Sequence, residues 1–302
     1  MQNSDQNPAC GRAEWVAVDL RCILAPNPSP MTGRGTNSYL LGQTELALID
    51  PGPNDPAHLD AILAAVGPGQ KITHILVTHA HRDHSGLAPG LARATGAPVL
   101  AFGPADAGRS LRMQALAQNE VPIGGEGVDH AFQPDRTLAD GDEISGAGWR
   151  MTALHTPGHF GNHLCLVWQD QVFCGDHVMG WSSSVIAPPD GDMGAYLTSL
   201  DRLAALQAAT LWPGHGDAVK NPAERIAELT SHRRARGTAI LAQLQNGPAD
   251  ASGLAQAIYH DTPASLMRAA AMNVFAHLID FTERNLAEPI GQIGFSSRFR
   301  AR

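Results

Sequence analysis

In residues 1–217, short apolar runs alternate with polar, glycine- and proline-rich turns. Apolar runs of strand length predict buried β-strands at residues 15–24, 37–41, 45–49, 72–77 and 98–101, and the second and third of these suggest a hairpin. Apolar residues at helical spacing predict helices at residues 56–66 and 85–94. Residues 103–134 lack a clear period apart from a short helical stretch at 108–117. We therefore expect a lid-like insertion there, a candidate for substrate contact.

The pattern changes after residue 217. Helical periodicity predicts three helices at residues 221–245, 251–259 and 263–287, and residues 291–299 suggest a short hairpin. Three helices followed by a hairpin is the order of a winged-helix module. We therefore expect two domains, comprising residues 1–217 and residues 218–302.

Histidine and aspartate gather directly after the predicted strand at residues 72–77. Within six positions the chain carries His79, His81, Asp83 and His84. Alternate residues of a strand-to-loop turn point the same way, so the first two histidines can bind one cation. The aspartate and the third histidine curl round the corner and can reach a second cation. Chance grouping on a solvated loop is the alternative, and the motifs further along the chain argue against it.

Three later apolar runs also end in a residue that can bind metal. The runs at residues 151–154, 171–175 and 210–214 lead to His159, Asp176 and His215, respectively. A glycine precedes each of these three residues and allows the backbone to turn sharply toward a site. Five histidines and two aspartates are a sufficient ligand set for two adjacent metal ions.

The motifs THAHRDHSG, TPGH, CGD and PGHG, in this order, resemble those of the metallo-β-lactamase superfamily. The resemblance implies an α+β fold, the αββα sandwich of that superfamily, with a site at the sheet edges. It implies one metal held by His79, His81 and His159, a second held by Asp83, His84 and His215, and Asp176 as the bridge. Antibiotic-destroying lactamases lack this bridging carboxylate, which makes antibiotic resistance an unexpected function here.

Three further segments, at residues 27–42, 232–241 and 257–285, resemble the lactamase-B-like protein 2 group. Members of that group follow the hydrolase core with a winged-helix-like domain, and the match covers nearly the whole chain. Some relatives are endoribonucleases that act on single-stranded RNA, so the resemblance brings RNA in as a candidate substrate.

The ligand set predicts the type of reaction. Two divalent ions about 3.5–4 Å apart can share one water and bring its pKa toward neutrality, which gives a bridging hydroxide. Asp83 is the expected catalytic residue, as acceptor of the proton of that water. We expect zinc, with manganese or iron as alternatives, because histidine and carboxylate suit all three.

These features lead to one main hypothesis and two enzymatic alternatives. The main hypothesis is a metal-dependent hydrolase of a small ester, thioester or lactone. The first alternative is a single-strand-specific endoribonuclease. The second is a mononuclear-iron persulfide dioxygenase that would use only His79, His159 and Asp176. A DNA-binding sensor is the weakest hypothesis, because the helix predicted at residues 263–287 holds few cations.

Charge favours a small-molecule partner over nucleic acid. Residues 1–217 carry 22 acidic and 11 basic residues, a net charge of −11, whereas residues 218–302 have a net charge of +3. An acidic body is a poor non-specific binder of phosphate backbones. RNA stays open as a partner because arginines cluster near the C-terminus, at Arg233, Arg234 and Arg236, and at Arg298, Arg300 and Arg302.

The remaining features of the sequence predict a cytoplasmic protein. The four cysteines show no CxxC spacing, the first fourteen residues lack the features of a signal peptide, and no apolar run is long enough to span a membrane. We expect no membrane partner and leave a homo-oligomer open. Among the other histidines, we expect His155 to be structural or to contact a ligand, and His163 to orient one.

Overall fold

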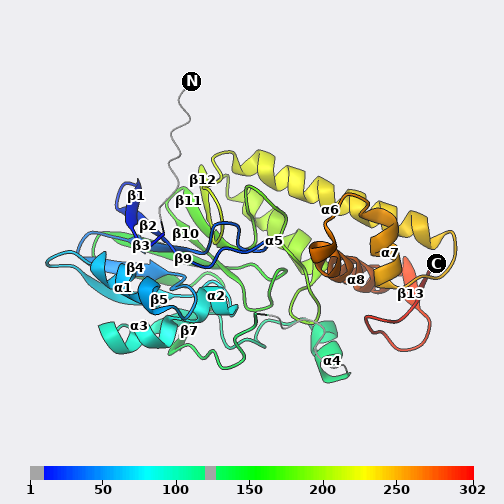
Figure 1. Cartoon of the computed structure of the whole chain (residues 1–302), viewed down its shortest axis with the longest axis horizontal. Helices are drawn as coiled ribbons and strands as arrows, with labels where there is room; N and C mark the ends of the chain where they lie inside the picture. The colour runs from blue at the N-terminus through cyan, green and yellow to red at the C-terminus, as the bar shows by residue number, and fades with distance from the viewer. Residues whose placement is uncertain (1–9, 120–126) are drawn as a thin grey trace.

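The computed structural model describes residues 10–119 and 127–302. It shows two large β-sheets with helices on their outer faces, and a mainly helical C-terminal part, with a small two-stranded sheet, at the end of a long helix (Figure 1). The expected αββα sandwich followed by a C-terminal helical domain is therefore confirmed. No helix of the described residues is long and apolar enough to cross a membrane.

The first sheet has seven strands in sequence order, antiparallel from β1 to β4 and parallel from β4 to β7. Their bounds are β1 (Ala13–Ala17), β2 (Leu20–Leu24), β3 (Asn37–Leu41), β4 (Glu45–Ile49), β5 (Lys71–Leu76), β6 (Val99–Ala101) and β7 (Arg136–Thr137). The predicted β3–β4 hairpin is confirmed. The single strand predicted at residues 15–24 is wrong, because Asp19, with φ 59°, turns the chain between β1 and β2.

The second sheet has the order β12-β11-β10-β9-β8, and only the β11–β12 pair is parallel. Its strands are β8 (Glu143–Gly146), β9 (Trp149–His155), β10 (Leu164–Trp168), β11 (Gln171–Gly175) and β12 (Thr210–Pro213). Buried side chains of both sheets, among them Tyr39, Met151 and Phe173, form the core between them. Each such side chain contributes about 1.5–3 kcal/mol through burial.

Helices cover the outer faces of both sheets. These are α1 (Pro56–Ala64), α3 (Ala88–Thr95) and α5 (Met193–Ala205), whereas the short helix α2 (Arg82–Ser85) lies between β5 and α3 in the chain. Asp55 caps α1, since its side chain accepts a hydrogen bond from the backbone N–H of His58 at 2.9 Å. The helix predicted at residues 85–94 is divided between α2 and α3, so its first residue, Ser85, instead ends α2.

The C-terminal part begins with the long helix α6 and is built around the buried helix α8. Its elements are α6 (Pro222–Leu244), α7 (Ala251–Ile258), the 3₁₀ turn η1 (Ala264–Leu266), α8 (Met267–Glu283), β13 (Ala287–Pro289) and β14 (Phe299–Ala301). The three predicted helices are found. The predicted hairpin is displaced, because β13 and β14 pair on either side of a loop that takes up most of residues 291–299.

The predicted insertion at residues 103–134 holds helix α4 (Leu111–Asn119), close to the helical stretch expected at 108–117. Met113 and Leu116 of α4 are buried in the same cluster as Phe275 and Leu278 of α8. Residues 120–126 of the insertion lie outside the described part of the chain. The described part of the insertion thus packs α4 against the C-terminal helices.

Candidate metal centre

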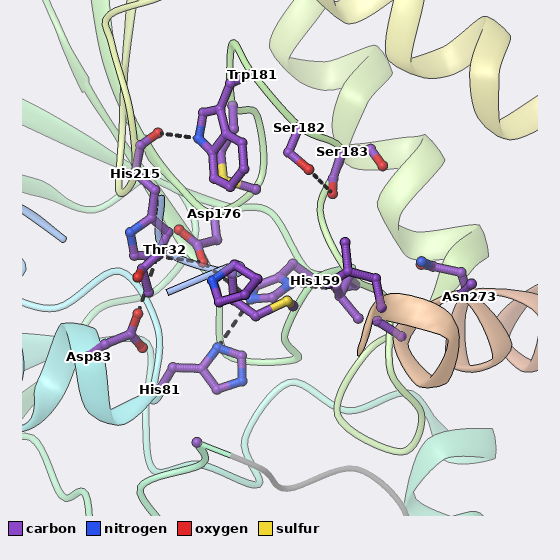
Figure 2. Close-up of a pocket in the computed structure, with 18 of the residues that line it drawn as sticks. Thr32, His81, Asp83, His159, Asp176, Trp181, Ser182, Ser183, His215 and Asn273 are labelled. Atoms are coloured by element: carbon purple, nitrogen blue, oxygen red, sulfur yellow. Dashed lines mark hydrogen bonds and ion pairs between the residues drawn. The ribbon is translucent and has the colours of Figure 1, made fainter. Parts of the chain in front are cut away.

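Strand ends bring all the predicted ligands together at one end of the sandwich. His79 and His81 follow β5, and Asp83 and His84 lie on α2, which begins just beyond. His159, Asp176 and His215 follow β9, β11 and β12, respectively (Figure 2). Because β5 and β11 belong to different sheets, the site joins the two halves of the sandwich.

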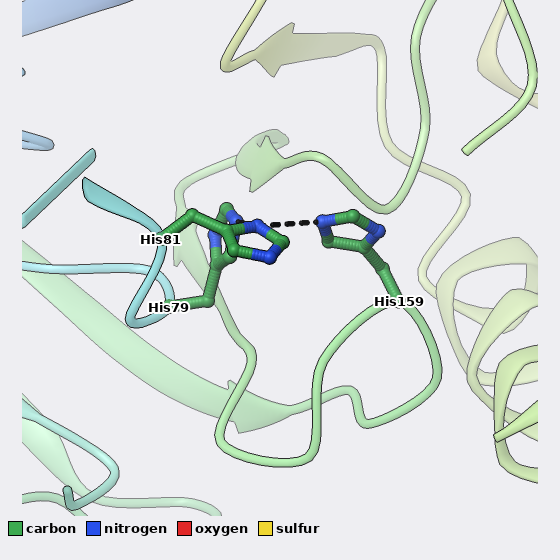
Figure 3. Close-up of side chains that lie close together, drawn as sticks. All are labelled: His79, His81 and His159. Carbon is green, nitrogen blue, oxygen red and sulfur yellow. Dashed lines mark hydrogen bonds between the residues drawn. The ribbon is translucent and has the colours of Figure 1, made fainter. Parts of the chain in front are cut away.

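The first group of ligand atoms comes from three histidines. His79, His81 and His159 point toward one another (Figure 3). Nδ1 of His81 lies 2.9 Å from Nε2 of His79 and 3.1 Å from Nε2 of His159. Burial lowers the pKa of all three imidazoles, to about 3 for His81. They are therefore neutral near pH 7, the form in which imidazole binds a metal.

The second group consists of Asp83, His84 and His215. Oδ2 of Asp83 lies 3.2 Å from Nε2 of His215 and 3.6 Å from Nε2 of His84. Burial would lower the pKa of the two imidazoles, but the neighbouring carboxylates outweigh it and raise both, that of His215 to about 9. The carboxylates thus draw positive charge to this group.

Asp176 lies between the two groups. Its Oδ1 is 3.4 Å from Nε2 of His84, and its Oδ2 is 3.3 Å from Nε2 of His215 and 3.8 Å from Nε2 of His159. Burial would raise the pKa of Asp176, but His215 and His84 hold it well below its usual value. Oδ1 of Asp176 and Nε2 of His84 are buried without a hydrogen-bond partner. Such a set of histidine nitrogens and carboxylate oxygens suits divalent cations, which would bind to these two unpartnered atoms.

Hydrogen bonds on the far side of the imidazole rings hold the ligands in place. Nδ1 of His84 lies 2.8 Å from Oδ2 of Asp50, and Nδ1 of His159 lies 2.6 Å from the carbonyl oxygen of Val185. Nδ1 of His215 lies 3.1 Å from the carbonyl oxygen of Gly35. Partners of this kind select the tautomer and orientation of a metal-binding imidazole.

Sequence profiles of known families match both parts of the chain. Residues 31–215 match the metallo-beta-lactamase superfamily, and residues 251–294 match the beta-lactamase associated winged helix domain. The chain belongs to the metallo-beta-lactamase superfamily. The family and the winged-helix domain expected from the sequence are thereby confirmed. Members of this superfamily are usually hydrolytic enzymes and bind divalent metals.

Relatives of this superfamily member share both parts of its architecture. The beta-lactamase-like protein 2 homolog of Drosophila melanogaster is 33% identical over 85% of this chain and 85% of its own length. A metallo-beta-lactamase family protein from Thermus thermophilus is 27% identical, with a TM-score of 0.76 over 95% of this chain and 100% of its own. A beta-lactamase domain protein from Burkholderia ambifaria has the same fold, with 22% identity and a TM-score of 0.81 over 99% and 96% of the two chains.

Sequence reasoning missed Asp50 as a member of this metallo-beta-lactamase centre. Besides its contact with His84, Asp50 accepts hydrogen bonds from the backbone N–H and the side-chain hydroxyl of Thr78, each at 2.8 Å. The available signal was a carboxylate directly after the predicted strand at residues 45–49, the same arrangement that identified Asp176. Asp50 therefore joins β4 to the metal centre.

The other histidines lie outside the two groups. His155 stacks on Phe102, with ring centroids 3.8 Å apart, and its Nε2 lies 2.9 Å from the carbonyl oxygen of Gly161. His163 lies near His79, at 5.2 Å between ring centroids, but its Nδ1 lies 3.0 Å from Thr156 Oγ1. The structure therefore gives His155 a packing contact, and it pairs His163 with a threonine rather than with a predicted ligand.

A cavity of about 510 Å³ opens in front of the ligands, and the C-terminal domain forms one of its walls. On one side lie His81, Asp83, His159, Asp176 and His215. The facing wall comes from the end of α7, from η1 and from α8, and includes Tyr259, Leu266 and Ala270. Asn273 of α8 lies on the same side (Figure 2). The winged-helix domain of this superfamily member therefore helps to enclose the site.

The segment 179–187, here called the clamp loop, connects the C-terminal domain to the ligands. Arg233 of α6 donates a hydrogen bond to the carbonyl oxygen of Ser184, and Asn273 of α8 accepts one from the backbone N–H of Ile186 at 2.9 Å. On its other face, the clamp loop contacts His159 through Val185, and the hydroxyl of Ser184 donates to the carbonyl oxygen of Asp176. The clamp loop thus contributes to the positions of His159 and Asp176.

The C-terminal arginines contribute to contacts within the protein. Arg233 is buried, and Arg236 lies over the ring of Tyr259 at 4.3 Å. Arg300 and Arg302 both form ion pairs with Glu288. Each of these four guanidinium groups already has a partner in the protein.

Proposed function

We propose that the chain is a binuclear, metal-dependent hydrolase that acts on a small ester, thioester or lactone. The position of Asp176 carries this proposal. It lies between the two groups of ligand atoms, and its Oδ1 faces His84 of the second group while its Oδ2 faces His159 of the first. His79, His81 and His159 would hold one ion, Asp83, His84 and His215 the other, and Asp176 would contact both.

The chemistry divides between the ions and the side chains. When bound, two divalent ions lower the pKa of a shared water and neutralise charge that develops on a substrate oxygen. Asp83 is placed to accept the proton of the attacking water: burial would raise its pKa, but His84 and His215 hold the pKa below its usual value, so it is ionised near pH 7. The surrounding histidines are oriented before any substrate arrives.

The second ligand group supports a two-metal enzyme over the iron dioxygenase. That alternative needs only His79, His159 and Asp176, whereas Asp83, His84 and His215 form a further group in this chain. Buried and half-buried ionisable groups are costly to bring together without a function. A complete second group is therefore expected to hold an ion.

The contacts of the arginines support a small substrate over RNA. An endoribonuclease needs cations available to phosphates along the strand. Arg233 is directed to the carbonyl oxygen of Ser184, and Arg300 and Arg302 are paired with Glu288. The cavity beside the ligands is also of a size that suits a small molecule.

Three finer points complete the proposal. We place the domain boundary between residues 217 and 218, because α6 begins at Pro222 and leads into the C-terminal part. Zinc is the proposed metal, with manganese or iron as alternatives. The unpaired state of the four cysteines supports a reducing, cytoplasmic location.

The experiment compares two substrates on metal-loaded protein. A simple thioester and a labelled single-stranded RNA are each incubated with the wild type and with Asp83→Asn. We expect thioester hydrolysis that falls by about 100-fold or more in the variant, and no RNA cleavage. RNA cleavage that is lost in Asp83→Asn, without thioester hydrolysis, would replace this proposal by the endoribonuclease.

A further inference from the structure

Trp181 presents an exposed aromatic surface directly beside the metal centre. Its side chain is 47% exposed and lines the cavity in front of the ligands. Its Nε1 donates a hydrogen bond to the carbonyl oxygen of His215 at 3.3 Å (Figure 2). Whatever occupies the cavity next to the second ligand group is therefore next to this indole ring.

Two glycines fix the orientation of the ring. Gly216, at φ +80°, packs so closely that a Cβ atom there would lie 2.4 Å from Cδ1 of Trp181. Gly33, at φ +60°, lies on the loop between β2 and β3, and a Cβ atom there would lie 3.4 Å from Cζ2 of Trp181. The ring is thus held before any substrate binds, and a preorganised surface lowers the entropic cost of binding.

The space around the ring continues past the ligands in a second direction. A second cavity of about 340 Å³ shares Met31, His81, His159 and Leu266 with the first and extends to Met272. Two spaces therefore meet at His81 and His159. This shape fits a substrate with a sizeable group on each side of the bond that is cleaved.

We propose that Trp181 forms an aromatic subsite for a flat, uncharged group next to the scissile carbonyl of an ester or thioester. The inference rests on the proposed hydrolase function and names its substrate class. The group would stack on the indole ring, with the thioether of the half-exposed Met31 in the lining of the same cavity.

The charges of the cavity favour an uncharged aromatic group over a nucleobase. A nucleobase is also flat, but its phosphates need cations nearby. Among the described residues that line the two cavities, the only arginines are Arg82 and Arg268, and no lysine is present. The same walls carry Asp83, Asp176 and Asp190. The ions would neutralise the two ligand carboxylates, Asp83 and Asp176, so away from the ions a phosphate chain would meet two guanidinium groups and Asp190, too few cations for several phosphates.

The test uses two thioesters of N-acetylcysteamine, with a phenylacetyl and an acetyl group. Their kcat/KM values are measured on metal-loaded wild type, Trp181→Ala, Trp181→Phe and the control Trp15→Ala, which removes an exposed tryptophan of β1 outside both cavities. We expect the wild type to favour phenylacetyl by about tenfold or more. Trp181→Ala should lose this preference, whereas Trp181→Phe and Trp15→Ala should keep it.

Calorimetric affinities for phenylacetate and acetate provide a readout that does not depend on turnover. The wild type should bind phenylacetate more tightly, and Trp181→Ala should not discriminate. The subsite is overturned if the wild type does not discriminate between the phenylacetyl and acetyl compounds. It is also overturned if Trp181→Ala keeps the wild-type preference. Cleavage of single-stranded RNA that Trp181→Ala loses, without discrimination between thioesters, also overturns it and assigns the ring to a nucleobase. If neither thioester is hydrolysed, the hydrolase proposal fails, and the affinities still decide the subsite.

Discussion

Single residues of the candidate metal centre differ in how the protein sets their charge. Burial keeps His79, His81 and His159 neutral, whereas carboxylates raise the pKa of His84 and His215. A metal-binding imidazole must be neutral, so a cation at the second group would replace protons that the carboxylates attract. Asp176 faces His159 of the first group and His84 and His215 of the second, so it is the most informative position to change.

Replacing Asp176 by Ala should reduce the bound metal from two ions per chain to one or fewer. The substitution removes the carboxylate that lies between the two groups, and we expect kcat/KM for a thioester to fall by about 100-fold or more. Elemental analysis after dialysis measures the metal content. Asp170→Asn, which changes an exposed aspartate between β10 and β11, is the control and should keep both ions. Retention of two ions and full turnover by Asp176→Ala would show that this carboxylate does not bridge.

Replacing Asp50 by Ala should weaken metal binding although Asp50 is not a predicted ligand. The variant removes the hydrogen-bond partner of His84 Nδ1, and loss of such a partner lowers metal affinity by about 10–100-fold. Competition with a chromophoric chelator measures the affinity. Asp60→Asn, on the exposed side of α1, should leave it unchanged. Equal affinities in Asp50→Ala and the wild type would make the contact purely structural.

The sequence singled out the predicted ligands through two patterns, four residues within six positions and three at the ends of apolar runs behind a glycine, whereas the contact of Asp50 with His84 depends on tertiary structure. His79, His81, Asp83 and His84 lie within six positions, and the strand-to-loop pattern alone groups them. Asp50 lies 34 positions before His84 and becomes its neighbour only when β4 and β5 pair side by side. Ala270 and Asn273 of the cavity wall likewise reach the site only in the folded protein, because they lie on α8, far from the ligands in the sequence.

At the scale of elements, α6 and α8 fix the clamp loop from one side while the ligands contact its other side. Arg225 of α6 adds two hydrogen bonds, to the carbonyl oxygens of Met179 and Ser182, each at 2.8 Å. The loop begins three positions after Asp176, and its Ser184 hydroxyl donates to the carbonyl oxygen of Asp176, so the loop contributes to the position of that residue. The C-terminal helices therefore support the metal centre without supplying a predicted ligand.

Replacing Arg233 by Met should destabilise the protein. The variant leaves the buried carbonyl oxygen of Ser184 without its guanidinium partner, and an unpaired buried acceptor costs about 1–3 kcal/mol. The free energy of unfolding in urea measures the effect. Arg234→Met changes the adjacent but exposed arginine of α6, and its effect should stay within about 0.5 kcal/mol. Equal effects of the two substitutions would contradict the role given to Arg233.

Elements with a clear period were predicted, and those shaped by tertiary contacts were not. The apolar runs gave β3, β4 and β11 with their observed bounds, and helical periodicity gave α6 to within a residue at each end. The predictions did not include α5, β8 and β10. The β1–β2 turn was missed because the apolar run continues through it, and only the positive φ of Asp19 reverses the chain.

At the scale of the whole molecule, the acidic metallo-beta-lactamase core and the basic C-terminal part are joined through buried contacts. Met113 and Leu116 of α4 pack with α8 residues, and α8 itself is largely buried. Of the arginines that the sequence left open for RNA, Arg233 contributes to this assembly through the carbonyl oxygen of Ser184, whereas Arg236, Arg300 and Arg302 have partners within the C-terminal part. The positive net charge of residues 218–302 therefore includes arginines that already have partners within the protein.

Stability should fall as the pH drops from about 6.5 to 4. Burial lowers the pKa of His58 to about 4, whereas the unfolded value is about 6.5. In this window the unfolded chain binds a proton that the folded chain does not, so lowering the pH favours unfolding. For His58 the loss between pH 7 and pH 5 is about 2 kcal/mol.

Urea unfolding of metal-free protein at the two pH values measures this dependence. His58→Gln should reduce the difference between pH 7 and pH 5, and His130→Gln, which removes an exposed histidine, should keep the wild-type difference. The same dependence in wild type and His58→Gln would show that another group is responsible.

The central claim, a hydrolase with two metal ions, is tested most directly by titrating metal-free protein with zinc while thioester hydrolysis is followed. The two ligand groups and the position of Asp176 between them predict that activity rises to its maximum at two equivalents per chain. Full activity at one equivalent would contradict the binuclear site, and no hydrolysis at two equivalents would contradict the hydrolase.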